Sequence, residues 1–395
     1  MGSYPHIFVT DFKWIESMVA TRSTRKAKEN SSSGGSKGGS SISLKLVLLA
    51  VFLPVSFVMF PNFWWHGIVL VDYFTEWSSF KSEFVNKYHK FLTDRLPDLE
   101  EQPAIEIHHS EATIERITEL SNGFTVPIVI RGAVAGARAL TEWTDVDFWT
   151  DSYANESVMC KFVGGYSDSN LCTIKDAFGL GEDSGQRQYI SGESKMFKRR
   201  PELETMVNSP FLDALDATGA MGTKVFTQIF MGFAKDGSDI HAAIGCNIFR
   251  QIAGRKKWWL IPTTQTAFVY SSLNQNGFSA HTKTNVGKQD EEESPWMKKL
   301  ERYTVELDPG DVLINTSWYW HGILNLGEDP DALIIGVPTR YKLPSASAAL
   351  RSNWLFSIIA RFAIEKQFGI ANFVKDTGLL QDGITKARSE RAAKV

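Results

Sequence analysis

The chain has 395 residues, a formal net charge of −3 at pH 7, an apolar fraction of 43% and a charged fraction of 22%. These proportions are typical of a globular protein and exclude a chain that is disordered throughout. Acidic and basic residues are interleaved without a long basic stripe, so nucleic acid is not expected as a partner.

The N-terminal region, residues 1–43, is expected to be flexible and cytoplasmic. Residues 22–43 are rich in Ser, Gly and Lys, and such a composition cannot bury a core. Basic residues precede the apolar segment that follows, at Arg22, Arg25, Lys26, Lys28, Lys37 and Lys45. The far side of that segment carries Asp72 and Glu76. Because positive charge marks the cytoplasmic flank of a membrane segment, we expect the N-terminus to be cytoplasmic.

A strongly apolar run, LVLLAVFLPVSFVMFPNFWW, occupies residues 46–65. Its length matches the ~20 residues that a helix needs to cross a bilayer. Trp64 and Trp65 lie where an interfacial aromatic layer would be. We therefore predict a single-pass membrane anchor over residues 44–73. Two prolines within the run leave open a shorter buried or peripheral hairpin.

This orientation puts the rest of the chain in the lumen of the secretory pathway. That compartment is oxidising and would allow a disulfide between Cys160 and Cys172. The sequon that begins at Asn155 would be an acceptor for N-glycosylation. The sequon at Asn315 is expected to lie within a buried strand and is discounted.

A helical lead-in, residues 74–122, is predicted next. It contains an amphipathic helix over residues 79–92, because aromatic side chains recur there at spacings of a helical face. These aromatic residues are Phe80, Phe84, Tyr88 and Phe91. We expect this face to pack against the main domain.

The main domain, residues 123–345, is predicted to be mainly β with flanking helices. It opens with a strand over Thr125–Ile130, a helix over Thr141–Tyr153 and a strand over Ser157–Phe162. Further short strands separated by Gly and Pro turns are predicted at Val225–Met231, Asn247–Ile252, Lys257–Ile261, Thr304–Leu307, Val312–Asn315 and Ala332–Val337. This spacing is typical of an antiparallel jelly roll, in which ligands bind between the two sheets.

Two sequence blocks carry a family resemblance. Residues 232–262 read GFAKDGSDIHAAIGCNIFRQIAGRKKWWLIP, and residues 308–326 read DPGDVLINTSWYWHGILNL. In this order they resemble the metal-binding blocks of the JmjC and cupin-like 2-oxoglutarate oxygenases, the group that includes the factor-inhibiting-HIF type of hydroxylase. The resemblance extends over residues 105–341 and implies a double-stranded β-helix.

The resemblance implies an iron site with one ligand replaced. His241 matches the first iron-binding histidine and His321 the second. Ala243 stands where the family has Asp or Glu. An Fe(II) facial triad needs two imidazoles and one carboxylate, so the position at Ala243 is vacant and metal binding should be weakened. No catalytic residue is predicted beyond this metal site.

The resemblance also implies a 2-oxoglutarate site. Lys256 matches the lysine that pairs with the distal carboxylate of the co-substrate, and Ser238 matches a hydroxyl that hydrogen-bonds the same group. Asn247 matches an asparagine near the co-substrate. The alternative for Lys256 is a solvated charge on the outer face of a turn. The neighbouring tryptophans at 258, 259, 318 and 320 are interpreted as packing residues, and His66, His108, His109 and His281 as structural histidines.

Three functions remain open for such a site. The first is a hydroxylase acting on a protein or small-molecule substrate with Fe(II) and 2-oxoglutarate at a two-histidine centre. The second is a catalytically inactive pseudo-oxygenase that serves as a binding module. The third is a halide-assisted oxygenase, because related halogenases also read His-x-Ala. Asp236 or Asp239 could also approach the metal from the preceding turn.

The C-terminal region, residues 346–395, is predicted to form helices and a solvated tail. Trp354, Ile358 and Phe362, with Leu355 and Ile359 alongside, form an apolar helical face. We expect this face to cover the barrel. The alternatives are a homodimer contact, which the family resemblance implies, and contact with the bilayer.

Overall fold

The computed structural model describes residues 55–75, 83–162, 170–181, 187–274, 277–282, 295–342 and 351–360. The predicted flexible region, the start of the predicted anchor, Phe80 and Phe362 lie outside these ranges. The chain divides into residues 1–54 and 55–395. The described residues all belong to the second of these units.

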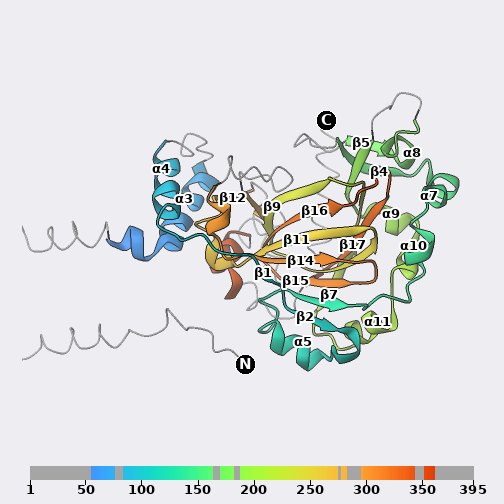
Figure 1. Cartoon of the computed structure of the whole chain (residues 1–395), viewed down its shortest axis with the longest axis horizontal. Helices are drawn as coiled ribbons and strands as arrows, with labels where there is room; N and C mark the ends of the chain where they lie inside the picture. The colour runs from blue at the N-terminus through green and yellow to red at the C-terminus, as the bar shows by residue number, and fades with distance from the viewer. Residues whose placement is uncertain are drawn as a thin grey trace, which may run out of the picture. The chain divides into compact units, whose positions relative to one another are not determined.

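Two mainly antiparallel sheets form the centre of the described chain (Figure 1). The seven-stranded sheet has the order β1 (Gln102–Pro103), β14 (Tyr303–Leu307), β11 (Arg255–Ile261), β16 (Trp320–Leu326), β9 (Gly237–Ala243), β13 (Ser279–Thr282) and β12 (Ser271–Leu273). The ten-stranded sheet has the order β2 (Glu106–His108), β3 (Ile128–Arg131), β15 (Val312–Asn315), β10 (Cys246–Ala253), β17 (Ile334–Lys342), β8 (Ile229–Gly232), β6 (Gln188–Glu193), β4 (Ser157–Phe162) and β5 (Asn170–Thr173), with β7 (Thr223–Thr227) paired to β17. The mainly β architecture with flanking helices is consistent with the predicted jelly roll.

Alternation along the strands separates the inside of the barrel from its helical cover. On β11, Trp258 and Leu260 pack inward against Phe249 of β10 and Leu313 of β15. The intervening Trp259 joins a different cluster on the outer face. Because successive side chains of a strand point to opposite faces, the same alternation directs Lys256 inward.

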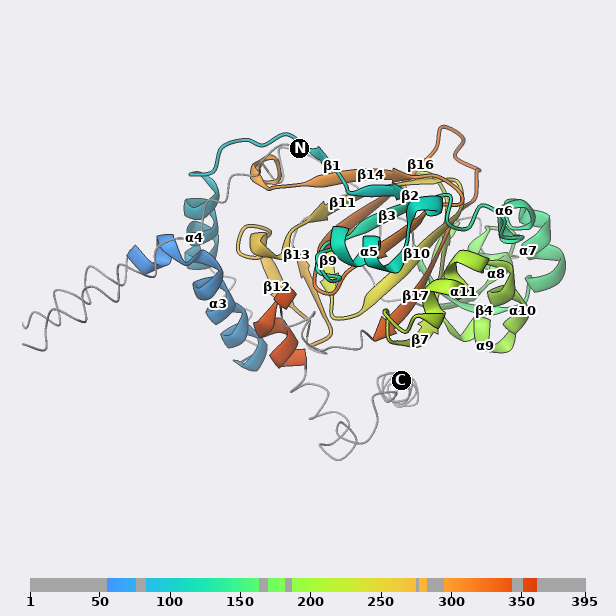
Figure 2. The same cartoon turned by 90° about the horizontal axis from the view of Figure 1, so that it is seen from below.

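Helices cover the sheets at two ends (Figure 2). At one end lie α3 (Pro61–Thr75) and α4 (Glu83–Thr93), with α3 in contact with β12. Between the first strands and the end of the barrel lie the helices α5 (Ile114–Leu120), α6 (Ala139–Glu142), α7 (Val146–Tyr153), α8 (Ile174–Ala177), α9 (Lys195–Arg199), α10 (Pro201–Met206) and α11 (Pro210–Ala217). Three single turns are η2 (His109–Glu111), η3 (Thr263–Gln265) and η4 (Met297–Lys299). Several helices begin at a residue whose side chain satisfies the first free N–H groups, as Thr173 does in a capping box with Asp176.

Within the described residues, no helix is both long enough and apolar enough to cross a membrane. Part of the predicted anchor packs on the barrel. Trp65, predicted to lie in an interfacial layer, is only 1% exposed, and its Nε1 donates to Ser271 Oγ of β12 (2.9 Å). Phe63, two residues earlier, is 64% exposed. One face of this helix therefore packs against the barrel, and the opposite face is exposed.

The predicted faces of the two amphipathic helices need correction. On α4 the buried residues include Val85, Tyr88 and Leu92, whereas Phe84 and Phe91 are exposed. The helix that begins at Trp354 buries Leu355, Phe356 and Ile359 in the cluster behind the seven-stranded sheet, which confirms that it covers the barrel. Trp354 and Ile358 nevertheless face outward. In both helices the predicted face is rotated relative to the one that packs.

Other predicted elements differ mainly at their ends. The strands at Ser157–Phe162 and Val312–Asn315 are found with the predicted bounds. The helix predicted over Thr141–Tyr153 is two helices, α6 and α7, and the strand predicted over Val225–Met231 is divided into β7 and β8. These breaks leave the order of elements unchanged.

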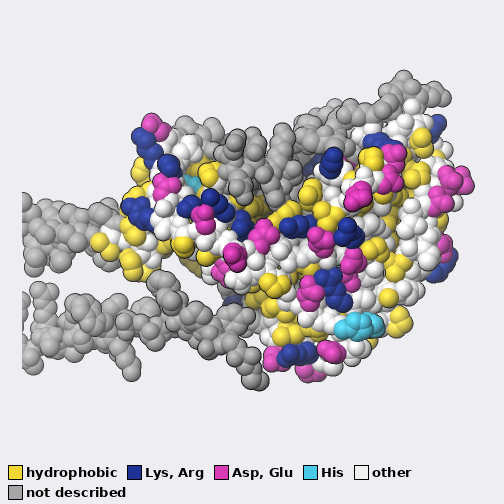
Figure 3. Space-filling model, viewed as in Figure 1, with side chains coloured by type: hydrophobic (Ala, Val, Ile, Leu, Met, Phe, Trp, Pro, Cys, Tyr) yellow, Lys and Arg dark blue, Asp and Glu magenta, His cyan; other side chains and the backbone are white. Residues whose placement is uncertain are grey.

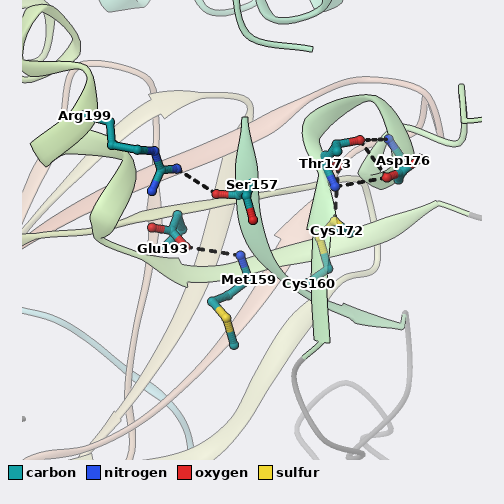
Figure 4. The surroundings of a disulfide bond; sticks show 8 residues. All are labelled: Ser157, Met159, Cys160, Cys172, Thr173, Asp176, Glu193 and Arg199. Atoms are coloured by element: carbon teal, nitrogen blue, oxygen red, sulfur yellow. Dashed lines mark hydrogen bonds between the residues drawn. A yellow bond between two sulfur atoms is a disulfide. The ribbon is translucent and has the colours of Figure 1, made fainter. Parts of the chain in front are cut away.

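Cys160 of β4 and Cys172 of β5 form a disulfide between neighbouring strands (Figure 4). Nearby, the buried Glu193 carboxylate accepts from the Met159 N–H (3.2 Å), and Arg199 donates to the Ser157 carbonyl (2.7 Å). These bonds and the disulfide join α9, β4, β5 and β6. The third cysteine, Cys246, is buried and free.

Candidate active site

The barrel brings His241 and His321 together. β9 and β16 are neighbours in the seven-stranded sheet, and their antiparallel register places His241 directly opposite His321. The ring centroids are 4.2 Å apart. At the other end of β9, Gly237 permits the close approach of the two strands, because a Cβ at that position would lie 2.3 Å from the Ile323 carbonyl oxygen of β16.

Both rings are oriented by the same kind of hydrogen bond. His241 Nδ1 donates to the Asp239 carbonyl oxygen (2.8 Å), and His321 Nδ1 donates to the Tyr319 carbonyl oxygen (2.9 Å). Since a carbonyl oxygen only accepts, these bonds put the ring proton on Nδ1 of each histidine. They leave the Nε2 lone pair of His241 for a ligand, whereas His321 Nε2 lies 3.4 Å from the Asn315 amide nitrogen, a donor that a metal ion would have to displace. Burial lowers the pKa of His321 to about 4 and the pKa of His241 well below its ordinary value. Both rings are thus neutral at pH 7, the form that binds a metal.

Ala243 lies on the same face of β9 as His241. Its carbonyl oxygen accepts from the Trp318 N–H (2.7 Å). Trp318 has φ of +59°, a left-handed conformation that costs about 1–3 kcal/mol outside glycine. This strained loop directly precedes His321 and fixes the backbone of Ala243 next to it.

Among the described residues, no cluster of acidic and histidine side chains replaces the ligand that Ala243 lacks. Asp236 is held in the turn before β9, where its Oδ2 accepts from the Phe233 N–H (2.9 Å). His281 of β13 lies directly opposite His241, but its ring stacks on that ring with centroids 5.6 Å apart and an interplanar angle of 16°. Across the described ranges, no three His, Cys, Asp or Glu side chains converge in a way that could hold a metal ion.

Lys256 is buried inside the barrel, only 1% exposed, which contradicts the solvated alternative. Its Nζ donates to Asn325 Oδ1 of β16, and Asn325 Nδ2 donates to the Phe233 carbonyl (2.9 Å). Burial lowers the pKa of Lys256 to about 7, opposed in part by the charge of Asp236. A buried amine with so little compensation is poised to bind an anion.

Unpaired polar atoms surround this interior. Ser238 Oγ and Asn247 Oδ1 are buried and have no hydrogen-bond partner in the part of the chain that the structure describes. Ser238 is opposite Ile323 on the strand that carries His321 and Asn325, and Asn247 lies on β10 of the facing sheet. Because buried polar groups are almost always paired, such orphaned groups indicate where a ligand or water binds.

Four polar residues near the site were not identified from the sequence as functional. The side-chain amide nitrogen of Asn315 lies 3.2 Å from His321 Nδ1 and 3.4 Å from His321 Nε2, although the sequence marks this residue only as the start of a sequon. Arg340 of β17 is opposite Asn247, and Asn325 binds Lys256. His281, interpreted as structural, stacks on His241. Their neighbours are distant in sequence, and only strand pairing brings them together.

The tryptophans behave as packing residues. Trp318 and Trp320 lie in the outer cluster and donate to Ser357 Oγ (2.8 Å) and Thr266 Oγ1 (3.1 Å). Trp258 faces inward and stacks on His321, with ring centroids 5.6 Å apart. Trp258 therefore packs against the ring of the second histidine and restricts its orientation.

The residues present fit Fe(II) and 2-oxoglutarate in part. Two neutral histidines with the ring proton on Nδ1 are suitable ligands through Nε2 once the Asn315 amide is displaced from His321, and Lys256 with the Ser238 hydroxyl suits a carboxylate. The carboxylate ligand of a facial triad is lacking. Any metal held here therefore needs its remaining ligands from the co-substrate or from solution.

Comparison with known proteins gives an independent view of the same region. Residues 122–341 match a family model described as a cupin-like domain. The chain is similar to HSPB1-associated protein 1 of Homo sapiens, with 37% identity over 78 residues that cover 20% of this chain and 16% of the relative. The Rattus norvegicus protein of that name gives 36% identity over 83 residues, 21% of this chain and 17% of the relative.

A more extended similarity is to Jumonji C domain-containing protein 5 of Drosophila melanogaster, 23% identical over 208 residues. It covers 49% of this chain and 50% of that protein. The matched region thus spans at most half the length of each of these relatives.

Proposed function

The chain belongs to the cupin-like family through residues 122–341, and on this basis we propose that it binds Fe(II) and 2-oxoglutarate as an oxygenase-like protein. The single observation that carries the proposal is the pair of adjacent histidines, both protonated on Nδ1, in the same barrel as the fully buried Lys256. In this arrangement the Nε2 atoms are the ring atoms that can bind a metal.

Each residue has a distinct part in the proposal. His241 and His321 hold the metal through Nε2, and Lys256 binds the distal carboxylate of 2-oxoglutarate as a charge-assisted donor. The Ser238 hydroxyl donates to the same carboxylate, and the Asn247 amide contacts the other end of the co-substrate. When bound, the iron would supply the oxidative decarboxylation of 2-oxoglutarate by O2 to succinate and CO2, coupled to hydroxylation of a C–H bond by the second oxygen atom. The substrate is a protein side chain or a small molecule.

Anaerobic titration with Fe(II) and 2-oxoglutarate tests the proposal. Introducing the missing ligand by Ala243→Asp should tighten Fe(II) binding at least about 10-fold, since losing even an outer-shell partner of a metal site costs about 10- to 100-fold. The double variant Ala243→Asp with His241→Ala should lose that gain. Unchanged Fe(II) affinity in Ala243→Asp would contradict the assignment of the site. Succinate release with candidate substrates, with and without chloride, then tests turnover and the halide-assisted alternative.

A second candidate function is a binding module without redox chemistry. It is favoured by the lack of a third protein ligand among the described side chains. In that case the protein stays folded and metal-poor, and its cellular function survives His241→Ala.

We also propose that residues 46–65 attach the protein to a membrane, with a cytoplasmic N-terminus and a lumenal barrel. Support comes from apolar side chains that are exposed at the described end of this run, namely Val55, Val58, Met59, Phe60 and Phe63. Figure 3 shows apolar side chains gathered at that end, and acidic and basic side chains interleaved elsewhere on the visible face. The Cys160–Cys172 disulfide and the exposed Asn155 suit an oxidising, glycosylating compartment.

Topology can be tested in sealed vesicles. Glycosidase sensitivity at Asn155 and protection of the barrel from added protease would support the lumenal location, and protease access would contradict it.

We further propose a homodimer through the C-terminal helices, which is supported by the outward-facing side chains of Trp354 and Ile358. Light scattering of the wild type and of Trp354→Glu would decide that question, because a monomeric wild type excludes it.

A further inference from the structure

Arg340 lies on the face of the ten-stranded sheet that looks toward the two histidines. On three adjacent strands, Asn315, Asn247 and Arg340 are directly opposite one another. Residues in register on adjacent strands share a face. Since the Asn315 amide touches the His321 ring, the guanidinium of Arg340 lies on the same side of the sheet as this contact.

The charge of Arg340 has no acidic partner in the described part of the chain. Its Nε donates to Gln228 Oε1 (3.1 Å), and Gln228 is fixed in turn by donating to the Gly192 carbonyl (2.9 Å). No ion pair involves Arg340 among the described residues. The outer edge of its guanidinium therefore remains available, whereas Arg131, for example, binds both Glu106 and Asp311.

The electrostatic interactions of Arg340 agree with the position that its strand register gives. Burial lowers the pKa of Arg340 to about 10, and its positive charge contributes to the lowered pKa values of His241 and His321. The one buried acid close to the co-substrate residues, Asp236, interacts with Lys256. The region next to the histidines consequently carries an excess of positive charge.

We infer that Arg340 anchors a subsite for a small monovalent anion, a carboxylate or a halide, beside the His241–His321 pair. This inference rests on the proposed function and deepens it, because the anion supplies the negative charge that Ala243 no longer provides. A guanidinium held at Nε presents its remaining N–H groups as a fork that suits a carboxylate. The methyl group of Ala243 leaves space where a carboxylate side chain would otherwise stand.

The subsite predicts that anion and metal affinities are coupled. Two unlike charges bound side by side favour each other, and such coupling is reciprocal. When no anion is bound, a metal ion next to the positively charged Arg340 is disfavoured, because like charges repel strongly in a low-dielectric interior. Metal binding should therefore depend on the anion present, and this dependence should be lost when the positive charge of Arg340 is removed.

The test is a Co(II) titration of the full chain in sodium formate, sodium chloride or sodium perchlorate at equal ionic strength. For the wild type we expect Co(II) to bind at least about 10-fold more tightly with formate or chloride than with perchlorate, as charge-assisted contacts allow. The formate and chloride series distinguish a carboxylate from a halide. Arg340→Gln should remove the difference, and Arg340→Lys should retain part of it.

Arg255→Gln is the matched control, because this arginine is exposed and pairs with Glu306 on the outside of the sheet. It should behave as the wild type does. Ala243→Asp offers a second route should Arg340→Gln not fold, since an internal carboxylate should abolish the response to anions. Equal Co(II) affinity in all three salts would overturn the inference, as would an unchanged anion response in folded Arg340→Gln.

Two further measurements separate this inference from the proposed function. Thermal stabilisation of the metal-free protein by formate or chloride, lost in Arg340→Gln, would support the subsite even if no metal binds. Conversely, 2-oxoglutarate binding that depends on Lys256, with no response to small anions, would support the proposed function and reject the subsite.

Discussion

Replacing Lys256 by Met should stabilise the ligand-free protein while weakening its affinity for 2-oxoglutarate. The amine is fully buried and its pKa is lowered from 10.5 to about 7 by burial. At about 1.36 kcal/mol for each pKa unit, keeping this group in the folded barrel at pH 7 costs about 4 kcal/mol. Methionine fills a similar volume without that cost. The substitution leaves Asn325 Oδ1 unpaired, which offsets about 1–3 kcal/mol of the gain.

The net expectation is a stabilisation of about 1–3 kcal/mol. Its pH dependence is a separate signature. Because the pKa of Lys256 is lower in the folded state than in the unfolded state, the unfolded protein binds more protons between about pH 7 and pH 10. The stability of the wild type therefore rises with pH across this window through this group, and Lys256→Met lacks that contribution.

The same substitution should weaken 2-oxoglutarate binding about 10- to 100-fold, the value of a lost charge-assisted hydrogen bond of about 1.5–3 kcal/mol. Urea unfolding between pH 7 and pH 9 and calorimetric titration measure the two effects. Lys257→Met is the control, since that side chain faces outward, pairs with Glu101 and lies over Trp259. A variant that is less stable than the wild type, or that binds 2-oxoglutarate equally well, would refute this account of the interior.

Three other outcomes are expected. Binding of 2-oxoglutarate at pH 8 should take up close to one proton, because Lys256 with a pKa of about 7 is mostly neutral in the free protein and charged in the complex. Calorimetry in buffers of different ionisation enthalpy should detect this proton uptake. Its absence would exclude Lys256 as the partner of the anion. Cys172→Ser should lower the free energy of unfolding by about 3 kcal/mol, since it opens the link between residues 12 apart; an unchanged urea midpoint in non-reducing buffer would contradict this. Phe356→Ala should cost about 3–5 kcal/mol, because the ring is fully buried against Trp318 and Trp320; a cost below about 1 kcal/mol would mean that the helix covers the barrel only loosely.

The sequence predicted the order of the strands better than the faces of the helices. The β-branched runs and the Gly and Pro turns locate strands such as β15 because both signals are local. The helical faces depend on what covers them. On α4, Phe84 has the spacing of a core residue, yet Val85 and Leu92 are buried instead, since the position of α4 against α3 and β12 selects the face.

In the candidate site, too, local sequence signals reveal some residues, whereas others depend on tertiary structure. His241, His321, Lys256 and Ala243 could be identified because two sequence blocks preserve their order and spacing. Arg340 and Asn315 carry no such signal. Arg340 lies at the far end of β17 and meets the site only through its register with Asn247, and strand pairing over long sequence separations is not visible in a single sequence.

These residues change the meaning of Ala243. A barrel that had merely lost a ligand would be expected to keep neutral surroundings or a substitute acid at the vacant position. Here the described residues next to the histidine pair instead include Arg340, whose guanidinium has only Gln228 as its hydrogen-bond partner. A dication without a carboxylate ligand and beside a guanidinium is doubly disfavoured, so we expect the site to bind a metal well only when an anion accompanies it. In the inferred subsite, Ala243 and Arg340 act together, because the negative charge that the protein does not supply at Ala243 is taken from solution.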